Sequence, residues 1–277
     1  MARSTLPTIS SLWIGPRLSF LEQLCLKSFA DAGHETKLYA YGKVDGVPDG
    51  VTVADAGEIM PASQFIVNTA TGSPGPHSDR FRYLLLDRTD EIWADTDAYC
   101  VKPFPASDYF FASHFRDLVN NGVLRLPRTS RTLRDLLDFT ATEYPELPAD
   151  FTFLTRSERA DYDKRRATPP GMHVSELPWE IWGPFALTYF LQKNGESEKR
   201  VPSHVLYPLI GGDIRRALQM PRNAKIRLPE DCLSIHFYGS RIRGLLKRRN
   251  GVPEPKSLLG SLCAKHGINA ADAPILD

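Results

Sequence analysis

Short runs of alternating hydrophobic and polar residues, separated by turns, open the chain. Such alternation predicts β-strands, because successive side chains of a strand point to opposite faces. We expect strands at residues 8–14, 37–41 and 51–54. Between the first two, residues 18–32 place apolar side chains at intervals of three and four, and Gly33 follows, which predicts a helix. Strand, helix and strand in this order indicate an α/β sheet domain.

The remaining pattern continues this organisation. Ser78 is expected to cap a helix over residues 79–88, and residues 91–101 predict a strand that stops and restarts around two aspartates. Residues 151–177 are polar and are interpreted as an irregular insertion or an active-site loop. Further strands are predicted at 109–113, 123–126 and 233–237, and further helices at 131–143 and 185–193. No internal repeat is found, so one α/β domain is expected over residues 1–277.

Composition and charge narrow the class of protein. The chain has 277 residues, with 34 Lys and Arg against 33 Asp and Glu, and this balance argues against a nucleic-acid binder. No apolar run reaches the ~20 residues that span a bilayer. The four cysteines are widely spaced and are interpreted as reduced core thiols: Cys25, Cys100, Cys232 and Cys263. A soluble protein of a reducing compartment, the cytoplasm, is expected.

The candidate chemistry lies at the interruption of the 91–101 strand. Asp95 and Asp97 are two apart, so in an extended chain both carboxylates project to one face and can bind one hard cation. A structural turn or helix cap is the alternative for these two residues. Asp161 and Asp163 have the same spacing, but they stand in a charged stretch that is typical of a solvated surface.

A second candidate group precedes this strand. Asp79 and Arg82 are three apart and share one face of the predicted helix. A surface ion pair is one interpretation. The functional interpretation is a carboxylate that accepts sugar hydroxyls beside a guanidinium that binds phosphate.

Together these segments resemble a known family. The stretch SDRFRY (78–83) followed by WADTD (93–97) is similar to the DXD sugar-binding region of glycosyltransferase family 32. This group includes bacterial polysaccharide transferases and α-1,4-galactosyltransferases. Further similarities follow in the same order along the chain: LWIG at 12–15, NNGV at 120–123 with Pro127, GP at 183–184 with LT at 187–188, and SIH at 234–236. Their joint occurrence is far more specific than any one motif.

The resemblance implies a GT-A-like fold, with a mixed central sheet flanked by helices. Residues 8–115 would bind a nucleotide-sugar, and residues 116–277 would form the acceptor side. Implied donor contacts are Trp13, Ser78, Asp79, Arg82, Tyr83 and Asp95. Implied ligands of Mn²⁺ or Mg²⁺ are Asp95, Asp97 and His236, and implied acceptor contacts are Asn120, Asn121 and Glu180. A core role for Trp13, a structural role for His236 and a plain loop position for Glu180 are the alternatives, and no catalytic nucleophile is identified.

The implied function is a metal-dependent glycosyltransferase of the hexosyltransferase type. It would move a sugar from a nucleotide-sugar, expected to be a UDP-sugar, to a glycan or lipid-linked acceptor with retention of configuration. Two alternatives remain open. A phosphohydrolase would use Asp95 as nucleophile and Asp97 as acid, and a non-catalytic module would bind nucleotide-sugar or glycan without turnover.

Two further features qualify this interpretation. Where family members have a Gly-Gly turn, this chain has Thr89-Asp90-Glu91, which is expected to place additional acidic charge near the diphosphate site. The run Arg241, Arg243, Lys247, Arg248 and Arg249 contains no acid. It is interpreted either as a solvated surface or as a patch for an anionic diphosphate, an anionic glycan or the inner face of a membrane.

Overall fold

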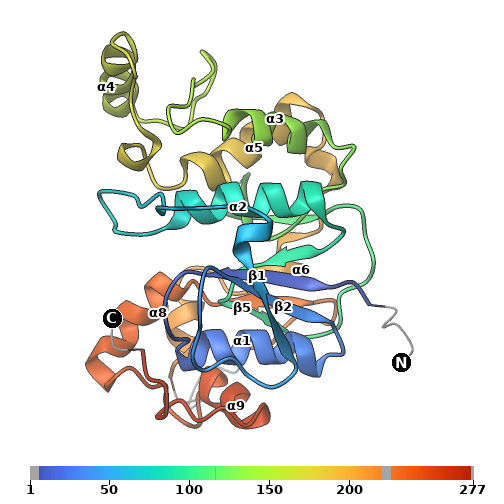
Figure 1. Ribbon diagram of the computed structural model, residues 1–277. Coiled ribbons are helices and arrows are strands. Elements are labelled where there is room, and N and C mark those ends of the chain that lie inside the picture. Colours follow the sequence, from blue (N-terminus) through green and yellow to red (C-terminus); the bar gives the residue numbers. More distant parts are fainter. Residues whose placement is uncertain (1–5, 116, 220–225, 276–277) are drawn as a thin grey trace.

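Six strands form a central sheet in the order β3-β2-β1-β4-β7-β6 (Figure 1). The computed structural model describes residues 6–115, 117–219 and 226–275, with only the backbone of Arg248. In this sheet β3, β2, β1 and β4 run parallel, whereas β7 runs antiparallel to both of its neighbours. The predicted α/β fold with a mixed central sheet flanked by helices is confirmed.

Most strands follow the predicted positions, but β7 begins five residues before the predicted range of 123–126. Those of the central sheet are β1 (Ile9–Trp13), β2 (Thr36–Ala40), β3 (Val51–Asp55), β4 (Ile92–Ala94), β6 (Phe110–Phe115) and β7 (Leu118–Arg125). β5 (Ala98–Cys100) and β8 (Ser234–His236) pair antiparallel in a separate two-stranded sheet. The interruption predicted around Asp95 and Asp97 is therefore the junction between two sheets.

Helices cover both faces of the central sheet (Figure 1). α2 packs against β4 and α3 on one face, and α1 packs against β2, β3, β5 and α9 on the other. The α-helices of the described residues are α1 (Phe20–Asp31), α2 (Gly75–Arg88), α3 (Arg131–Phe139), α4 (Arg156–Arg166), α5 (Ala186–Lys193), α6 (Ser203–Leu206), α7 (Asp213–Ala217), α8 (Gly239–Leu246) and α9 (Leu258–Lys265). Short 3₁₀ turns occupy Ala56–Glu58, Val174–Glu176, Ser197–Lys199 and Lys247–Arg249, and a π-helical turn occupies Ile181–Phe185. The four cysteines are buried and unpaired, as predicted.

Two local predictions are wrong. α2 begins at Gly75, so Ser78 lies inside the helix and does not cap it. Pro76 is accommodated in the first turn, where the backbone N–H that proline lacks would have no helical partner. The stretch predicted to be irregular contains α4, whose N-terminus is a capping box between Thr155 and Glu158.

The loop before α2 is tied to the helix by His77. Its Nδ1 accepts a hydrogen bond from the Ile66 N–H at 3.4 Å, and its Nε2 lies 3.0 Å from the Tyr41 hydroxyl. That hydroxyl donates to the Met60 carbonyl, so Nε2 must be the donor and the ring is neutral. Burial, with the nearby charge of Arg80, lowers the pKa of His77 to about 4.

This buried neutral histidine predicts a loss of stability in acid. The unfolded state takes up a proton below the ordinary pKa of about 6.5, whereas the folded state does so only near 4, so stability falls as the pH drops through this window. We expect His77 to make the free energy of unfolding about 2 kcal/mol smaller at pH 5 than at pH 7. Urea denaturation of the wild type and of His77→Gln at both pH values isolates this contribution. An equal decline in the two proteins would contradict it.

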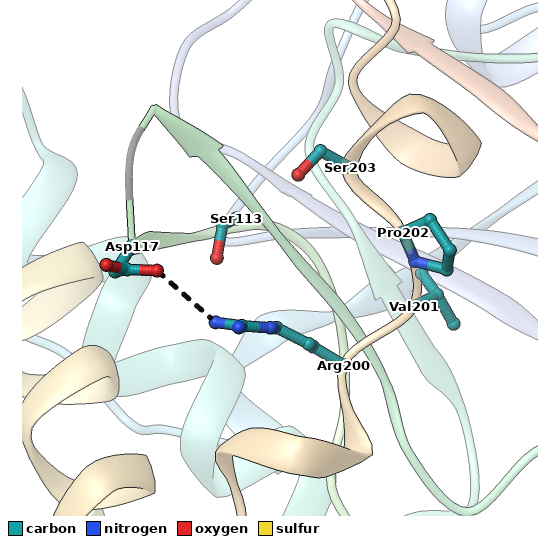
Figure 2. A pocket seen from close by; sticks show the side chains of 6 residues that line it. All are labelled: Ser113, Asp117, Arg200, Val201, Pro202 and Ser203. Carbon is teal, nitrogen blue, oxygen red and sulfur yellow. Dashed lines mark ion pairs between the residues drawn. The ribbon is translucent and has the colours of Figure 1, made fainter.

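A pocket of about 320 Å³ lies between β6, the start of β7 and the segment that leads into α6. Its lining includes Ser113, Asp117, Arg200 and Ser203 (Figure 2). Within the described part of the chain, no helix is long and apolar enough to cross a membrane.

Candidate metal and sugar-nucleotide site

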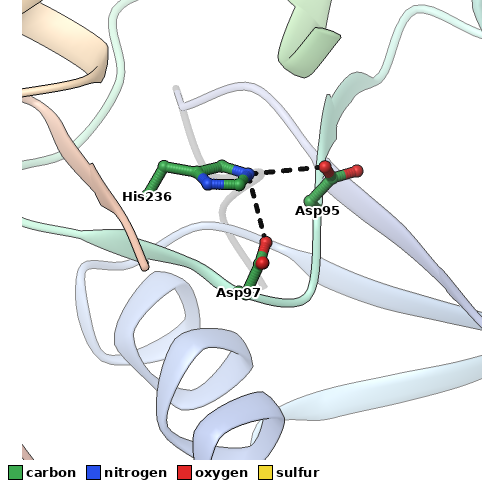
Figure 3. A group of neighbouring side chains, drawn as sticks. All are labelled: Asp95, Asp97 and His236. Carbon is green, nitrogen blue, oxygen red and sulfur yellow. Dashed lines mark hydrogen bonds and ion pairs between the residues drawn. The ribbon is translucent and has the colours of Figure 1, made fainter. Parts of the chain in front are cut away.

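Asp95, Asp97 and His236 converge at the junction between the two sheets (Figure 3). The two aspartates lie between β4 and β5, and His236 ends β8, where it is paired in register with Ala98 of β5. His236 Nε2 lies 3.5 Å from Asp95 Oδ2 and 3.2 Å from Asp97 Oδ1. One ligand atom from each residue lies within 4.8 Å of the others, so all three can contact a single ion.

The carboxylates are held so that one oxygen of each faces this centre. Asp97 Oδ2 accepts a hydrogen bond from the Gly239 N–H at 2.6 Å, and Asp95 Oδ1 accepts one from Trp93 Nε1 at 2.8 Å. Asp97 Oδ1 is buried and makes no hydrogen bond to any described residue; its approach to His236 lacks hydrogen-bond geometry. Burying a carboxylate oxygen without a hydrogen-bond partner or a bound cation costs free energy. Two carboxylate oxygens and one imidazole nitrogen fit Mn²⁺ well, and the oxygens fit Mg²⁺.

His236 is the third member of the group. Its Nδ1 accepts a hydrogen bond from the Tyr238 N–H at 3.2 Å, so the proton of the neutral ring belongs on Nε2, facing both aspartates. Burial lowers the pKa of His236, but Asp97 and Asp95 outweigh burial and raise it overall. A cation bound at Nε2 would compete with this proton.

Arg82 of α2 connects the carboxylates of two motifs. Its guanidinium lies 3.2 Å from both Asp79 Oδ1 and Asp95 Oδ1, and it donates to the Asn121 carbonyl at 2.6 Å. It also donates to the backbone and hydroxyl oxygens of Ser78, and it stacks over the ring of Trp93 at 4.6 Å. The side chains of Arg82 and Asp79 are each 5% exposed. The Arg82 guanidinium is thus occupied by protein groups, and it holds Asp95 in place.

The pKa values of Asp79 and Asp95, the two carboxyl groups that contact Arg82, are shifted in opposite directions. Burial raises the pKa of Asp79 to about 6, although Arg82 and a hydrogen bond from Asn121 at 2.8 Å oppose this shift. At Asp95 burial also raises the pKa, but the charge of Arg82 and the contact with His236 lower it overall. Asp95 therefore remains ionised, as a metal ligand must be.

Glycines make room for this arrangement. A Cβ on Gly122 would lie 2.5 Å from His236 Nε2 and 2.8 Å from Asn120 Oδ1, and one on Gly183 would lie 2.8 Å from Asp79 Oδ2. Real Cβ atoms do not approach other atoms so closely. His236 and Asp79 can occupy their positions only because glycine stands opposite each of them.

Gly122→Ala is therefore expected to displace His236 or β7. We expect at least a tenfold loss of Mn²⁺ affinity, with overpacking that costs about 1–3 kcal/mol of stability. Isothermal titration with Mn²⁺ measures the affinity. Gly244→Ala on α8 is the control, since a Cβ there meets nothing within 4 Å. Equal affinities for the two variants would contradict this role of Gly122.

The other predicted contacts are distributed around this centre. Asn121 and Ser78 belong to the Arg82 network, whereas the Asn120 side chain accepts from the Gly122 N–H at 2.6 Å. Tyr83 is buried close to Asp79 and Asn121, and its hydroxyl donates to the Trp182 carbonyl at 2.6 Å. Trp13, at the end of β1, is partly exposed, and its buried Nε1 has no partner among the described residues.

Glu180 immediately precedes the π-helical turn that carries Gly183. Burial raises its pKa, and its charge in turn raises that of Asp79. An acceptor role for this carboxylate stays a prediction.

Two tyrosines that no motif indicated complete the surroundings of His236. The Tyr207 hydroxyl accepts from the Val123 N–H at 3.0 Å and donates to the Asn120 carbonyl at 3.3 Å. The Tyr238 ring lies 4.5 Å from the His236 ring, and the Tyr238 backbone adopts a left-handed φ of 52°. Such an angle is unusual for a bulky residue and often marks a functional site. The sequence indicated Tyr238 only through its position two residues after His236.

The structure corrects the expectation about the Thr89-Asp90-Glu91 turn. The buried Glu91 carboxylate accepts from Ser10 and Lys37, each at 2.6 Å, where β4 begins. Asp95 follows the other end of β4, about 13 Å away along an extended chain. Glu91 is therefore neutralised by Lys37, and Asp90 pairs with Arg125 at 3.3 Å, so neither acid adds its charge to the metal-ligand group, which consists of Asp95, Asp97 and His236. The turn also needs no glycine, because none of these three residues has a positive φ.

Several side chains of the basic run on α8 and the following turn contact other residues of the protein. Arg243 pairs with Glu22 at 2.9 Å, Arg249 pairs with Glu254 at 2.8 Å, and Arg241 lies over the Tyr238 ring. Lys247 is exposed, and the Arg248 side chain lies outside the described structure. Anion or membrane binding by this run stays a prediction.

The second pair of aspartates with the same spacing, Asp161 and Asp163, lies on α4. Asp163 pairs with Arg159 and Arg166 on the surface, as expected.

Comparison with known proteins adds only a distant similarity. No protein-family model matches the chain, and no curated protein matches it in sequence. Among solved structures, the PaToxG glycosyltransferase is similar with a TM-score of 0.43 and 14% sequence identity, over 70% of this chain and 72% of that one. A similarity of this size carries no residue roles.

Proposed function

We propose that this protein is a metal-dependent glycosyltransferase with a GT-A-like fold that uses a nucleotide-sugar donor. The observation that supports it most is the group Asp95, Asp97 and His236, held beside the buried Asp79–Arg82 pair. This group lies just beyond the carboxyl end of β4, and ligands of open α/β sheets bind in this region. The motif resemblance to family 32 supports the same function.

In this proposal one set of residues binds the cation and another binds the donor sugar. Asp95, Asp97 and His236 hold Mn²⁺ or Mg²⁺, which when bound acts as a Lewis acid and neutralises the charge of the departing nucleoside diphosphate. Arg82 fixes the orientation of Asp95 through the 3.2 Å contact, so Arg82 acts as a positioning residue. The carboxylate of Asp79, held beside Arg82, is the group that we assign to the hydroxyls of the donor sugar.

The remaining assignments concern the two substrates. Trp13 packs against the base, which we propose to be uracil, and Ser78 and Tyr83 support the donor side from α2. Asn120, Asn121 and Glu180 face the acceptor, a glycan or a lipid-linked saccharide, and transfer proceeds with retention. Lys247 and its basic neighbours bring the protein to the inner face of a membrane that carries such an acceptor.

A thermal-shift screen of nucleotide-sugars, each with and without Mn²⁺, tests this function. A ligand that binds only the folded state at a hundred times its Kd adds about 2.7 kcal/mol of stability, which raises the melting temperature by several degrees. We expect a UDP-sugar to produce this shift only when Mn²⁺ is present. Absence of both binding and hydrolysis for every common nucleotide-sugar would overturn the proposal.

A further inference from the structure

The pocket beside β6 contains a buried hydroxyl that has no hydrogen-bond partner among the described residues. Ser113 is 5% exposed, and its Oγ makes no hydrogen bond to any described residue. Figure 2 shows this hydroxyl directed toward the space between the Asp117 carboxylate and the Arg200 guanidinium. A buried polar group in this state indicates a ligand or water that is bound in the functional protein.

The other polar groups of the pocket are also available. Arg200 Nη1 and Asp117 Oδ1 are 3.7 Å apart, too far for a hydrogen bond, so each keeps capacity for a ligand. The Ser203 hydroxyl lies across the same space (Figure 2). Pro202 and Val201 add an apolar wall. The volume of about 320 Å³ is at the lower end of the range for small-molecule sites.

This combination matches the surface of a neutral sugar ring. The guanidinium donates, the carboxylate accepts, and the serine hydroxyls do both, so together they complement hydroxyl groups that also do both. Among the described lining residues one positive and one negative side chain, Arg200 and Asp117, balance each other, which disfavours a strongly charged ligand. The apolar wall suits the C–H face of a pyranose.

The pocket is separate from the metal-ligand group but adjacent to it. Ser113 lines the pocket, and the ring of the next residue, His114, lies 6.2 Å from the Tyr238 ring. Tyr238 in turn packs on His236. Consecutive residues of β6 thus line the pocket and lie near the rings that surround His236.

We infer that this pocket, lined by Ser113, Asp117, Arg200, Val201, Pro202 and Ser203, is a saccharide-binding site for one neutral hexose unit of a glycan. Binding of the sugar is independent of the reaction at Asp95 and Asp97. Its use as a remote subsite for the acceptor glycan rests on the proposed glycosyltransferase function.

A glycan array tests the binding itself. Di- to tetrasaccharides of glucose, galactose and mannose are compared with their uronic-acid and phosphorylated counterparts, and the best neutral ligand is titrated by calorimetry. We expect neutral oligosaccharides to bind, and Ser113→Ala and Arg200→Gln each to weaken binding about tenfold or more, the equivalent of about 1.4 kcal/mol. Arg165→Gln on α4 is the matched control, since Arg165 is 36% exposed and ion-paired while Arg200 is 39% exposed and ion-paired. It is expected to leave the affinity unchanged.

Two further measurements separate this inference from the proposed function. Asp97→Asn is expected to bind the oligosaccharide normally, and the two pocket variants are expected to keep the Mn²⁺-dependent shift with a nucleotide-sugar. If the pocket binds glycan but no nucleotide-sugar raises the melting temperature, this inference stands and the proposed function fails. The inference is overturned if no neutral glycan binds, if only the acidic counterparts bind, or if Asp97→Asn abolishes binding that Arg200→Gln preserves.

Discussion

Asp97→Asn is expected to abolish Mn²⁺-dependent binding of the donor, with at least a hundredfold loss of affinity, while the fold is retained. Oδ1 of Asp97 is buried, lies 3.2 Å from His236 Nε2 and has no hydrogen-bond partner among the described residues. Asparagine keeps the size and can still accept from the Gly239 N–H through its carbonyl oxygen. It then turns an NH₂ group, which cannot ligate a cation, toward the centre, and one negative charge is lost.

Thermal shift and calorimetry with Mn²⁺ and the nucleotide-sugar measure this effect. Asp163→Asn is the matched control, because Asp163 also stands two residues after another aspartate but lies on the surface of α4 in ion pairs. Exposed pairs of this kind contribute about 0–1 kcal/mol, so the control should behave like the wild type. An unchanged Mn²⁺-linked stabilisation in Asp97→Asn would remove Asp97 from the metal-ligand group.

Arg82→Met is expected to produce the largest loss of stability, about 3–5 kcal/mol, because it leaves an uncompensated buried charge. Asp79, 5% exposed, loses its positive partner, and the carbonyl of Asn121 and the oxygens of Ser78 lose donors. Asp95 loses the group that orients it, so donor binding should fall as well.

Urea denaturation by linear extrapolation gives the free energy of unfolding. Arg80→Met on the same helix is the control. Among the described residues, the Arg80 side chain donates a hydrogen bond to the Ala141 carbonyl alone. The double variant Asp79→Asn, Arg82→Met should be less destabilised than the sum of the two single variants, because the unpaired carboxylate is then gone. If Arg82→Met were no more destabilising than Arg80→Met, the buried network would not have the role assigned to it.

The sequence predicted the fold well wherever a local pattern decided the structure. Alternation was sufficient for β1 and β2, and for α1 the apolar spacing was sufficient, reinforced by the capping box of Ser19 with Glu22. The prediction was wrong where two local signals competed. The helix was predicted to begin only after Ser78, whereas Gly75 and Pro76 form its first turn, where proline is well tolerated. In α4 the charged composition obscured the capping box of Thr155 and Glu158.

The site was predictable only in part, and for a physical reason. Asp95 and Asp97 are two apart in the sequence, so their spacing could be interpreted directly, whereas His236 lies 141 residues beyond Asp95 and was identified only through the family resemblance. The contribution of Gly122 depends on where β7 passes His236, and that of Tyr207 depends on contacts with Asn120 and Val123. Such distant contacts leave no periodic signal in the sequence.

The pairing of β5 with β8 has a consequence for the order in which the protein matures. During synthesis β1, β2, β3 and β4 are available to pair long before β8 leaves the ribosome, so β5 and the two aspartates must wait for their partner strand. Closing a loop of 141 residues costs only a little more entropy than closing a shorter one, but it is slow. The metal-ligand group is therefore completed late, and cation uptake by a nascent or truncated chain would report that its C-terminal strand has docked.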